Sequence, residues 1–279
     1  MALPCRVCGA ATRPAAHLAP LPFHTCGSCG FIFRVDERDA GQVRDTYESG
    51  AYMEVRAAEY TDPETLRHRR RDANVRLDYM ESFVTSGRLL DVGAAGGAFV
   101  EQAALRGFHA EGLEPTPEFV AFAADELGVT LHGSTVEDAG LEPGALDVAT
   151  MWHVLEHVPD PVEVLSQLRD AVRPGGLVVI EVPNAGSYLA HRDGVAWTSL
   201  EPDVHVNQFG ARSLRAALEA AGLSVARLGS LTITEYLEPS ARWQLRHVAH
   251  RLKAAIALRS PRARHPDGHE LLRAVGRRV

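Results

Sequence analysis

The stretch Leu89-Leu-Asp-Val-Gly-Ala-Ala-Gly-Gly97 decides how this chain of 279 residues is expected to fold. Its apolar residues up to Val92 predict a short buried strand, and its glycines predict a tight turn into a helix from about Ala98 to Arg106. Small residues in such a turn let the backbone approach a ligand closely, and the amino end of the helix attracts negative charge. The stretch therefore predicts a ligand site at the end of a strand. A tight turn without a ligand is the alternative that the stretch alone leaves open.

Strands and helices alternate along the rest of the chain. A helix over 63–83 precedes the stretch; after it, strands are predicted at 109–114, 129–132, 146–151 and 177–182, and helices at 117–127, 161–172 and about 214–221. This alternation predicts an α/β fold with a parallel, doubly wound, Rossmann-like sheet that binds ligands at the carboxyl ends of its strands. Two further strands, 223–228 and 231–237, follow each other without a helix, so we expect an antiparallel hairpin at one edge.

Glu114 ends the strand after the glycine-rich turn, 23 residues beyond Asp91. A carboxylate in this place can accept hydrogen bonds from both hydroxyl groups of a ribose. The turn and Glu114 together therefore favour a nucleoside-containing cofactor. Nicotinamide enzymes have a similar turn, so these residues alone leave the kind of cofactor open.

All four cysteines lie within the first 30 residues, as two C-x2-C pairs: Cys5 with Cys8, and Cys26 with Cys29. Two such pairs separated by 17 residues are typical of a zinc site with four cysteine ligands. We therefore expect an N-terminal zinc ribbon whose Zn²⁺ is structural, because no coordination position is left open for catalysis. Two disulfides are the alternative, and a reducing compartment disfavours them.

Charge is distributed unevenly, although the net charge is only −7. Residues 240–279 contain ten Arg or Lys and two acids, so this tail carries +8 and the remaining residues carry −15. A mostly acidic body argues against nucleic acid as the main ligand. The tail is expected to be a solvated helix surface or a loose terminus, with contact to an anionic partner as the alternative. We find no secretory signal and no membrane span, so a cytoplasmic location is expected.

Several segments resemble the class I S-adenosylmethionine-dependent methyltransferases. Residues 89–97 resemble motif I of that family, and Leu146-Asp-Val followed by Val154-Leu-Glu-His-Val-Pro-Asp-Pro161 resembles its fourth-strand region. Arg173-Pro-Gly-Gly-Leu-Val-Val-Ile-Glu-Val-Pro-Asn184 resembles its fifth strand, and His205-Val-Asn-Gln-Phe209 resembles a segment that closes many small-molecule members. The resemblance spans roughly residues 86–235 in the right order, and nicotinamide enzymes do not show the segments 154–161 and 173–184 together.

The resemblance implies S-adenosylmethionine as cofactor and indicates which residues hold it. These are Asp91, Gly93, Ala94 and Gly97 around the methionine part, Glu114 at the ribose, Pro115, Thr135 and Val136 at the adenine, and Met151 and Trp152 beside the sulfonium.

Three histidines, His153, His157 and His205, are candidate catalytic residues. Methyl transfer to a hydroxyl group needs a base with a pKa near the working pH, and histidine is suited to this. His205 lies in a segment expected to cross the mouth of the pocket, so we expect it to serve the acceptor; a packed, hydrogen-bonded histidine is the alternative. Some relatives bind a divalent metal through a glutamate in the place of His153, so His153 with Glu156 could do likewise. Glu156 and His157 could equally be structural.

We therefore expect a methyltransferase that acts on a small-molecule acceptor, by O-methylation of a sugar or natural-product hydroxyl. The expected organisation is a zinc module at 1–35, a helical cap or linker at 36–85, a cofactor-binding domain at 86–238 and a basic helical tail at 239–279. Methyltransferases of nucleotide-linked deoxysugars also have a cysteine-pair N-terminus, so C-methylation of such a sugar is an alternative. A nicotinamide-dependent nucleotide-sugar enzyme and a non-catalytic zinc-ribbon adaptor remain as other classes.

Overall fold

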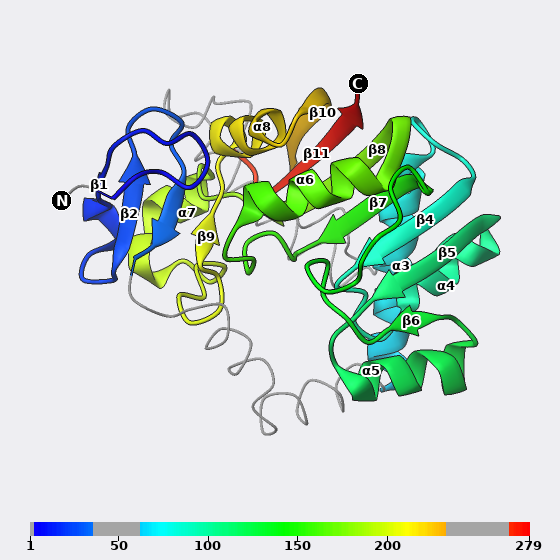
Figure 1. Cartoon of the computed structure of the whole chain (residues 1–279). Helices are drawn as coiled ribbons and strands as arrows, with labels where there is room; N and C mark the ends of the chain where they lie inside the picture. Colours follow the sequence, from blue (N-terminus) through cyan, green and yellow to red (C-terminus); the bar gives the residue numbers. More distant parts are fainter. Residues whose placement is uncertain (1–2, 36–61, 233–267) are drawn as a thin grey trace.

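A seven-stranded sheet forms the centre of the computed structural model, which describes residues 3–35, 62–232 and 268–279 (Figure 1). The strand order is β10-β11-β8-β7-β4-β5-β6. Neighbouring strands are parallel except at β11, which runs antiparallel to both β8 and β10. The strands are β4 (Gly87–Val92), β5 (Phe108–Leu113), β6 (Leu131–His132), β7 (Leu146–Trp152), β8 (Val172–Pro183), β10 (Leu223–Leu231) and β11 (Leu271–Arg278). This architecture confirms the predicted doubly wound fold.

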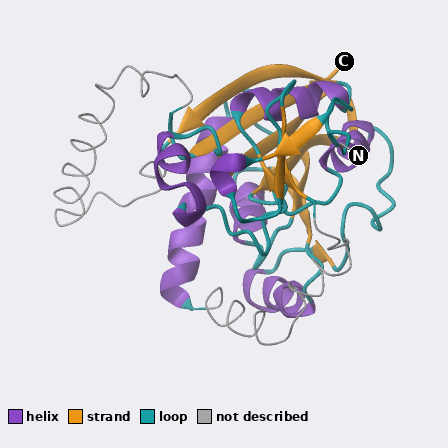
Figure 2. Cartoon of the chain, turned by 90° about the vertical axis from the view of Figure 1, so that its left-hand side faces the viewer, coloured by secondary structure: helices purple, strands orange, loops and turns teal. Residues whose placement is uncertain are grey.

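Helices cover both faces of this sheet (Figures 1 and 2). Successive side chains of β8 alternate between the faces, as the pleat of a strand requires. Val178 and Ile180 belong to the core on the side of α6 (Pro161–Ala171) and α8 (Ala211–Ala220). Leu177 and Val179 belong to the core beneath α3 (Pro63–Met80) and α4 (Ala98–Leu105). The other α-helices of the described residues are the short α5 (Pro117–Phe122) and α7 (Tyr188–Asp193). No helix in the described ranges is both long and apolar enough to cross a membrane.

A second, smaller sheet contains the cysteine-rich N-terminus. Its strands are β1 (Thr12–Pro14), β2 (Phe23–Cys26), β3 (Ile32–Arg34) and β9 (Asn207–Gln208), in that order. β3 pairs antiparallel with β9, so the last strand of this sheet comes from the segment after β8. The N-terminal strands therefore form one sheet with a strand that is about 170 residues away in the sequence.

The C-terminal residues differ from the expectation. Residues 223–231 form a single strand, so the expected hairpin of 223–228 with 231–237 is wrong. Its antiparallel neighbour is β11, within the region expected to be a helical tail. β11 lies between two other strands and is buried on both faces, so it lacks the alternation that marks a half-buried strand. Three expected segments lie wholly or partly outside the described residues: residues 36–61 of the linker expected at 36–85, residues 233–237 of the strand expected at 231–237, and residues 239–267 of the tail.

Arg273, in the middle of β11, is buried and paired. Its Nε and Nη2 donate to Oε2 of Glu181 on β8 at 2.8 and 2.5 Å. Its guanidinium also lies 4.6 Å from the ring centroid of Tyr79 and 5.8 Å from that of Trp152. A charged side chain is tolerated in a protein core when it is paired in this way. The sequence suggested that the arginines of the tail are solvated. Arg273 is an exception, because it is buried.

We predict that Arg273→Ala lowers the free energy of unfolding by about 3 kcal/mol or more, because it removes one side of a buried ion pair. Urea denaturation of the purified protein measures the change. Arg277→Ala is the matched control in the same strand: Arg277 is exposed, so the expected change is within about 0.5 kcal/mol. A loss below about 1 kcal/mol for Arg273→Ala would show that the ion pair stabilises the fold little.

Candidate active site at the carboxyl ends of the strands

The turn after β4 has the backbone conformation that its glycines predict. Gly93 and Gly97 have φ angles of 68° and 82°, in the left-handed region that favours glycine. A Cβ on Gly93 would lie 2.5 Å from Cγ2 of Val154, so no side chain fits there. The amides of Gly93 and Ala94 donate to the carbonyl of Leu113 at 2.8 and 3.0 Å, which joins the turn to the end of β5. The turn is therefore a close-fitting cradle at the edge of the sheet.

Glu114 lies directly beside this turn. Its Oε2 accepts from the amide of Ala95 at 2.8 Å, and its Oε1 accepts from the amide of Thr116 at 3.0 Å. The side chain is buried, and burial raises the pKa of the carboxyl group. Each carboxylate oxygen has a further lone pair, so the group can still accept hydrogen bonds from a ligand. Glu114 is therefore held in place before any ligand arrives.

Asp91 is buried at the end of β4, and its expected contact with the methionine part of the cofactor stays a prediction. Its carboxylate lies inside the sheet, 2% exposed, where Oδ1 accepts from the hydroxyl of Thr150 on β7 at 2.6 Å. Burial raises its pKa to about 7. The side chain thus links β4 to β7 beneath the turn.

The other residues implied at the cofactor site line the same region in varied environments. Ala94, Val136, Met151 and Trp152 are buried, Thr135 is half-buried beside Asp138, and Pro115 is exposed next to Glu114. Their contacts with a cofactor stay a prediction.

His153 follows β7 in a strained conformation, with a φ angle of 60°. Its Nδ1 lies 3.4 Å from Oε1 of Glu156, and its Nε2 lies 3.3 Å from Oε1 of Glu181. Burial lowers the pKa of His153, but the hydrogen bonds and charges of the two carboxylates outweigh it and raise the pKa to about 9. At neutral pH His153 is therefore a cation, which weighs against its role as a general base.

Arg76, on α3, is a charged residue of this site that was not expected from the sequence. Its Nη2 lies 3.3 Å from Oε1 of Glu181, and its guanidinium lies 5.0 Å from the ring centroid of Trp152. Its positive charge also acts to lower the pKa of Asp91. The spacing of residues in the sequence indicates that Arg76 faces the core. It is three residues after the buried Ala73 and four before the buried Met80, so it lies on the apolar face of the helix.

Glu156, His157 and His205 come together in space, although 48 residues separate the last two. One ligand atom of each lies within 4.8 Å of the others, and the two imidazole centroids are 4.6 Å apart. Nδ1 of His157 lies 3.0 Å from the carbonyl of Val204, and Nδ1 of His205 lies 2.8 Å from that of Ser199. A neutral imidazole that donates from Nδ1 has its lone pair on Nε2. Burial lowers the pKa of His157 to about 4, so this ring is neutral.

Glu156 is 2% exposed, and its Oε1 faces Nδ1 of His153 at 3.4 Å. A buried carboxylate beside two imidazole nitrogens is a donor set suited to a divalent ion. The set differs from the expected pair of His153 and Glu156, because His153 bridges two carboxylates instead.

The four cysteine sulfurs also converge. The Sγ atoms of Cys5 and Cys29 are 3.6 Å apart, and those of Cys8 and Cys26 are 3.5 Å apart. All four cysteines lie in the described range 3–35, and no disulfide joins them. A zinc ion with zinc–sulfur distances of about 2.3 Å needs sulfur–sulfur edges of about 3.8 Å, so the spacing suits a tetrahedral site.

A family model described as a methyltransferase domain matches residues 65–228. This match covers more than half of the chain, and the chain therefore belongs to that family. Together with the fold, it confirms the resemblance to class I S-adenosylmethionine-dependent methyltransferases.

The curated relatives include ubiquinone biosynthesis O-methyltransferases. That of Aeromonas salmonicida (strain A449) is 39% identical over 119 residues, which are 39% of this chain and 50% of that protein. That of Marinobacter nauticus is 34% identical over 145 residues, 48% of this chain and 61% of that protein. The chain spans about half the length of the curated relatives it matches.

Solved structures share the fold. Geranyl diphosphate C-methyltransferase from Streptomyces coelicolor A3(2) has a TM-score of 0.55 and 18% identity, covering 80% of this chain and 88% of that one. A possible histamine N-methyltransferase from Thermotoga maritima has a TM-score of 0.54 and 16% identity, covering 85% and 97%. At such identities the likeness shows the fold alone.

We predict that Glu114→Ala weakens S-adenosylmethionine binding by about a hundredfold or more, because two charge-assisted hydrogen bonds to the ribose are lost. Calorimetry of the purified protein measures the dissociation constant. Glu111→Ala, an exposed acid on the same strand, is the control and should bind normally. A change below about threefold for Glu114→Ala would place the ribose elsewhere.

Proposed function

We propose that the protein transfers a methyl group from S-adenosylmethionine to a hydroxyl group of a small molecule. The supporting observation is that two groups of residues follow the strands of the central sheet. The glycine turn and Glu114 follow β4 and β5, and Glu156 and His157 follow β7, where His205 from the segment before β9 joins them. The first group suits the cofactor and the second group suits an acceptor. The relatives named O-methyltransferases support oxygen as the acceptor atom.

In this mechanism the protein positions the acceptor in line with the sulfonium methyl group and excludes water. His205 is the residue that we assign to the acceptor side, where its Nε2 accepts the hydroxyl proton or holds the acceptor oxygen. The strained, cationic His153 lies beside this group through Glu156 and stabilises negative charge on the acceptor oxygen. The acceptor class that we propose is a sugar or a natural-product hydroxyl.

Glu156, His157 and His205 are also the residues that would hold a divalent ion. Such an ion supplies Lewis acidity, which lowers the pKa of a bound hydroxyl group.

A product-mass screen tests the proposed reaction. Purified protein with S-adenosylmethionine is offered sugars, polyketides and aromatic natural products, and a product heavier by one methylene group is expected. NMR of the product then distinguishes an O-methyl from a C-methyl group, since C-methylation of a nucleotide-linked deoxysugar is the competing assignment. S-adenosylmethionine that binds without any methylated product across all classes would contradict a small-molecule methyltransferase.

We predict that His205→Ala lowers turnover by roughly 10²- to 10⁴-fold while S-adenosylmethionine affinity stays nearly unchanged. Turnover and calorimetry on one preparation measure both. His191→Ala, an exposed histidine on α7, is the control. Normal turnover in His205→Ala would return this histidine to a packing role. If chelator-treated protein loses activity and Mg²⁺ or Mn²⁺ restores it, His205 acts as an ion ligand.

We also propose that the four cysteines hold one structural zinc ion. Elemental analysis is expected to find about one zinc per chain, and the double variant Cys5→Ser, Cys26→Ser should lose it. Ser28→Ala, within the same turn, should retain the metal. Zinc-free wild-type protein, or a double variant that keeps its zinc and its stability, would contradict this assignment.

A further inference from the structure

The N-terminal cysteine module, residues 3–35, is joined to the segment that contains His205. β3 pairs with β9, with Ile32 opposite Gln208 and Phe33 opposite Asn207. The amide of Arg34 donates to the carbonyl of Val206 at 2.9 Å, which extends this pairing to the residue after His205.

Side chains of the module also contact the segments that contain His205 and His157. The guanidinium of Arg34 donates to the carbonyl of Pro202, and that of Arg6 donates to the carbonyl of Pro159 at 3.1 Å. The rings of Phe31 and Phe209 lie 5.2 Å apart. The module therefore contacts both the 202–209 segment and the turn that follows Glu156 and His157.

Asn207 connects these two segments. It is fully buried, its amide donates to the carbonyl of Glu156 at 2.9 Å, and its Nδ2 donates to the carbonyl of Val158. His157 in turn lies 3.0 Å from the carbonyl of Val204. The positions of Glu156, His157 and His205 are thus tied to β9, a strand of only two residues.

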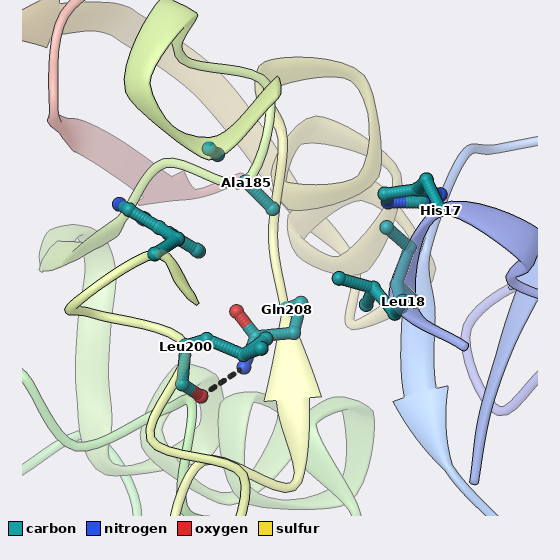
Figure 3. A pocket seen from close by; sticks show the side chains of 8 residues that line it. His17, Leu18, Ala185, Leu200 and Gln208 are labelled. Carbon is teal, nitrogen blue, oxygen red and sulfur yellow. Dashed lines mark hydrogen bonds between the residues drawn. The ribbon is translucent and has the colours of Figure 1, made fainter. Parts of the chain in front are cut away.

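Residues of both the module and this segment line the seam between them. A small pocket is lined by His17, Leu18 and Ile32 on one side and by Leu200 and Gln208 on the other (Figure 3). Within the second side, Nε2 of Gln208 donates to the carbonyls of Leu200 and His205. A two-residue strand at such a seam depends on its neighbour for order, because so short a strand is not stable alone.

We propose that the zinc module is the scaffold of the acceptor half of the site: metal binding by the four cysteines fixes β3, which positions β9 and, through Arg34 and Asn207, the group formed by Glu156, His157 and His205. This rests on the proposed function in assigning zinc to the cysteines and the acceptor to the histidines. The cofactor half does not depend on the module, because the turn after β4 and Glu114 are held by β5 and β6. Arg34 and Asn207 are positioning residues in this account.

Amide hydrogen exchange on the full chain, with zinc bound and after its removal by a chelator, tests the proposal without an acceptor. The amides of Arg34, His205 and Asn207 report on the scaffold, and those of Gly93 and Glu114 report on the cofactor half. Zinc removal should speed exchange at the first three by roughly tenfold or more and leave the other two within about twofold. The dissociation constant of S-adenosylmethionine should also stay within about threefold.

Arg34→Ala is the variant that leaves all four cysteines in place. It should keep its zinc and still speed exchange at His205 and Asn207, whereas Arg13→Ala, exposed on β1, should change neither. Unchanged exchange at His205 and Asn207 in zinc-free protein would overturn the proposal. Equal loosening of Gly93 and Glu114 would overturn it too, since the two halves would then unfold together. Failure to find a methylated product would leave these exchange rates untouched, so the proposed reaction and the scaffold are tested separately.

Discussion

The parallel register of the central strands is the constraint on which the candidate site depends. Val92 at the end of β4 lies opposite Leu113 on one side and Met151 on the other, and Trp152 lies opposite Glu181 on β8. Parallel strands in register end at the same edge, so the residues that follow them meet there. The glycine turn, Glu114 and His153 are neighbours for this reason alone.

Several buried charged side chains at this edge share the carboxylate of Glu181. Glu181 accepts from Arg273, lies 3.3 Å from Arg76 and lies 3.3 Å from His153, so two strands, a helix and the turn after β7 share one carboxylate. Each charge is compensated by a neighbour, as the low dielectric of an interior requires. The arrangement keeps His153 protonated and in a strained conformation, which costs of order 1–3 kcal/mol and persists only where the surroundings enforce it. The C-terminal strand thereby contributes to the active-site edge through Arg273.

Local signals in the sequence predicted most of the fold and brought the glycine turn and Glu114 to one place in it. Glycines at 93 and 97, the apolar run of β4 and Glu114 lie within 30 residues of one another, and each has a direct physical meaning. β11 could not be predicted in this way, because an arginine in a strand indicates an exposed position. Arg273 is buried only because Glu181 lies opposite it on the neighbouring strand. The histidine group gave a partial signal: the candidates were named, but their grouping around Glu156 depends on β9 and therefore on tertiary structure. The spacing of the cysteines predicts a zinc site, but it does not predict that β3 pairs with β9.

We expect this edge of the sheet to bind S-adenosylmethionine and not another nucleoside cofactor. Calorimetry with S-adenosylmethionine and with NAD on the same purified chain tests this most directly. One S-adenosylmethionine should bind per chain, and NAD should give no heat. Binding of NAD without binding of S-adenosylmethionine would contradict it and favour a nicotinamide enzyme, and binding of neither would leave the cysteine module as the functional part of the chain.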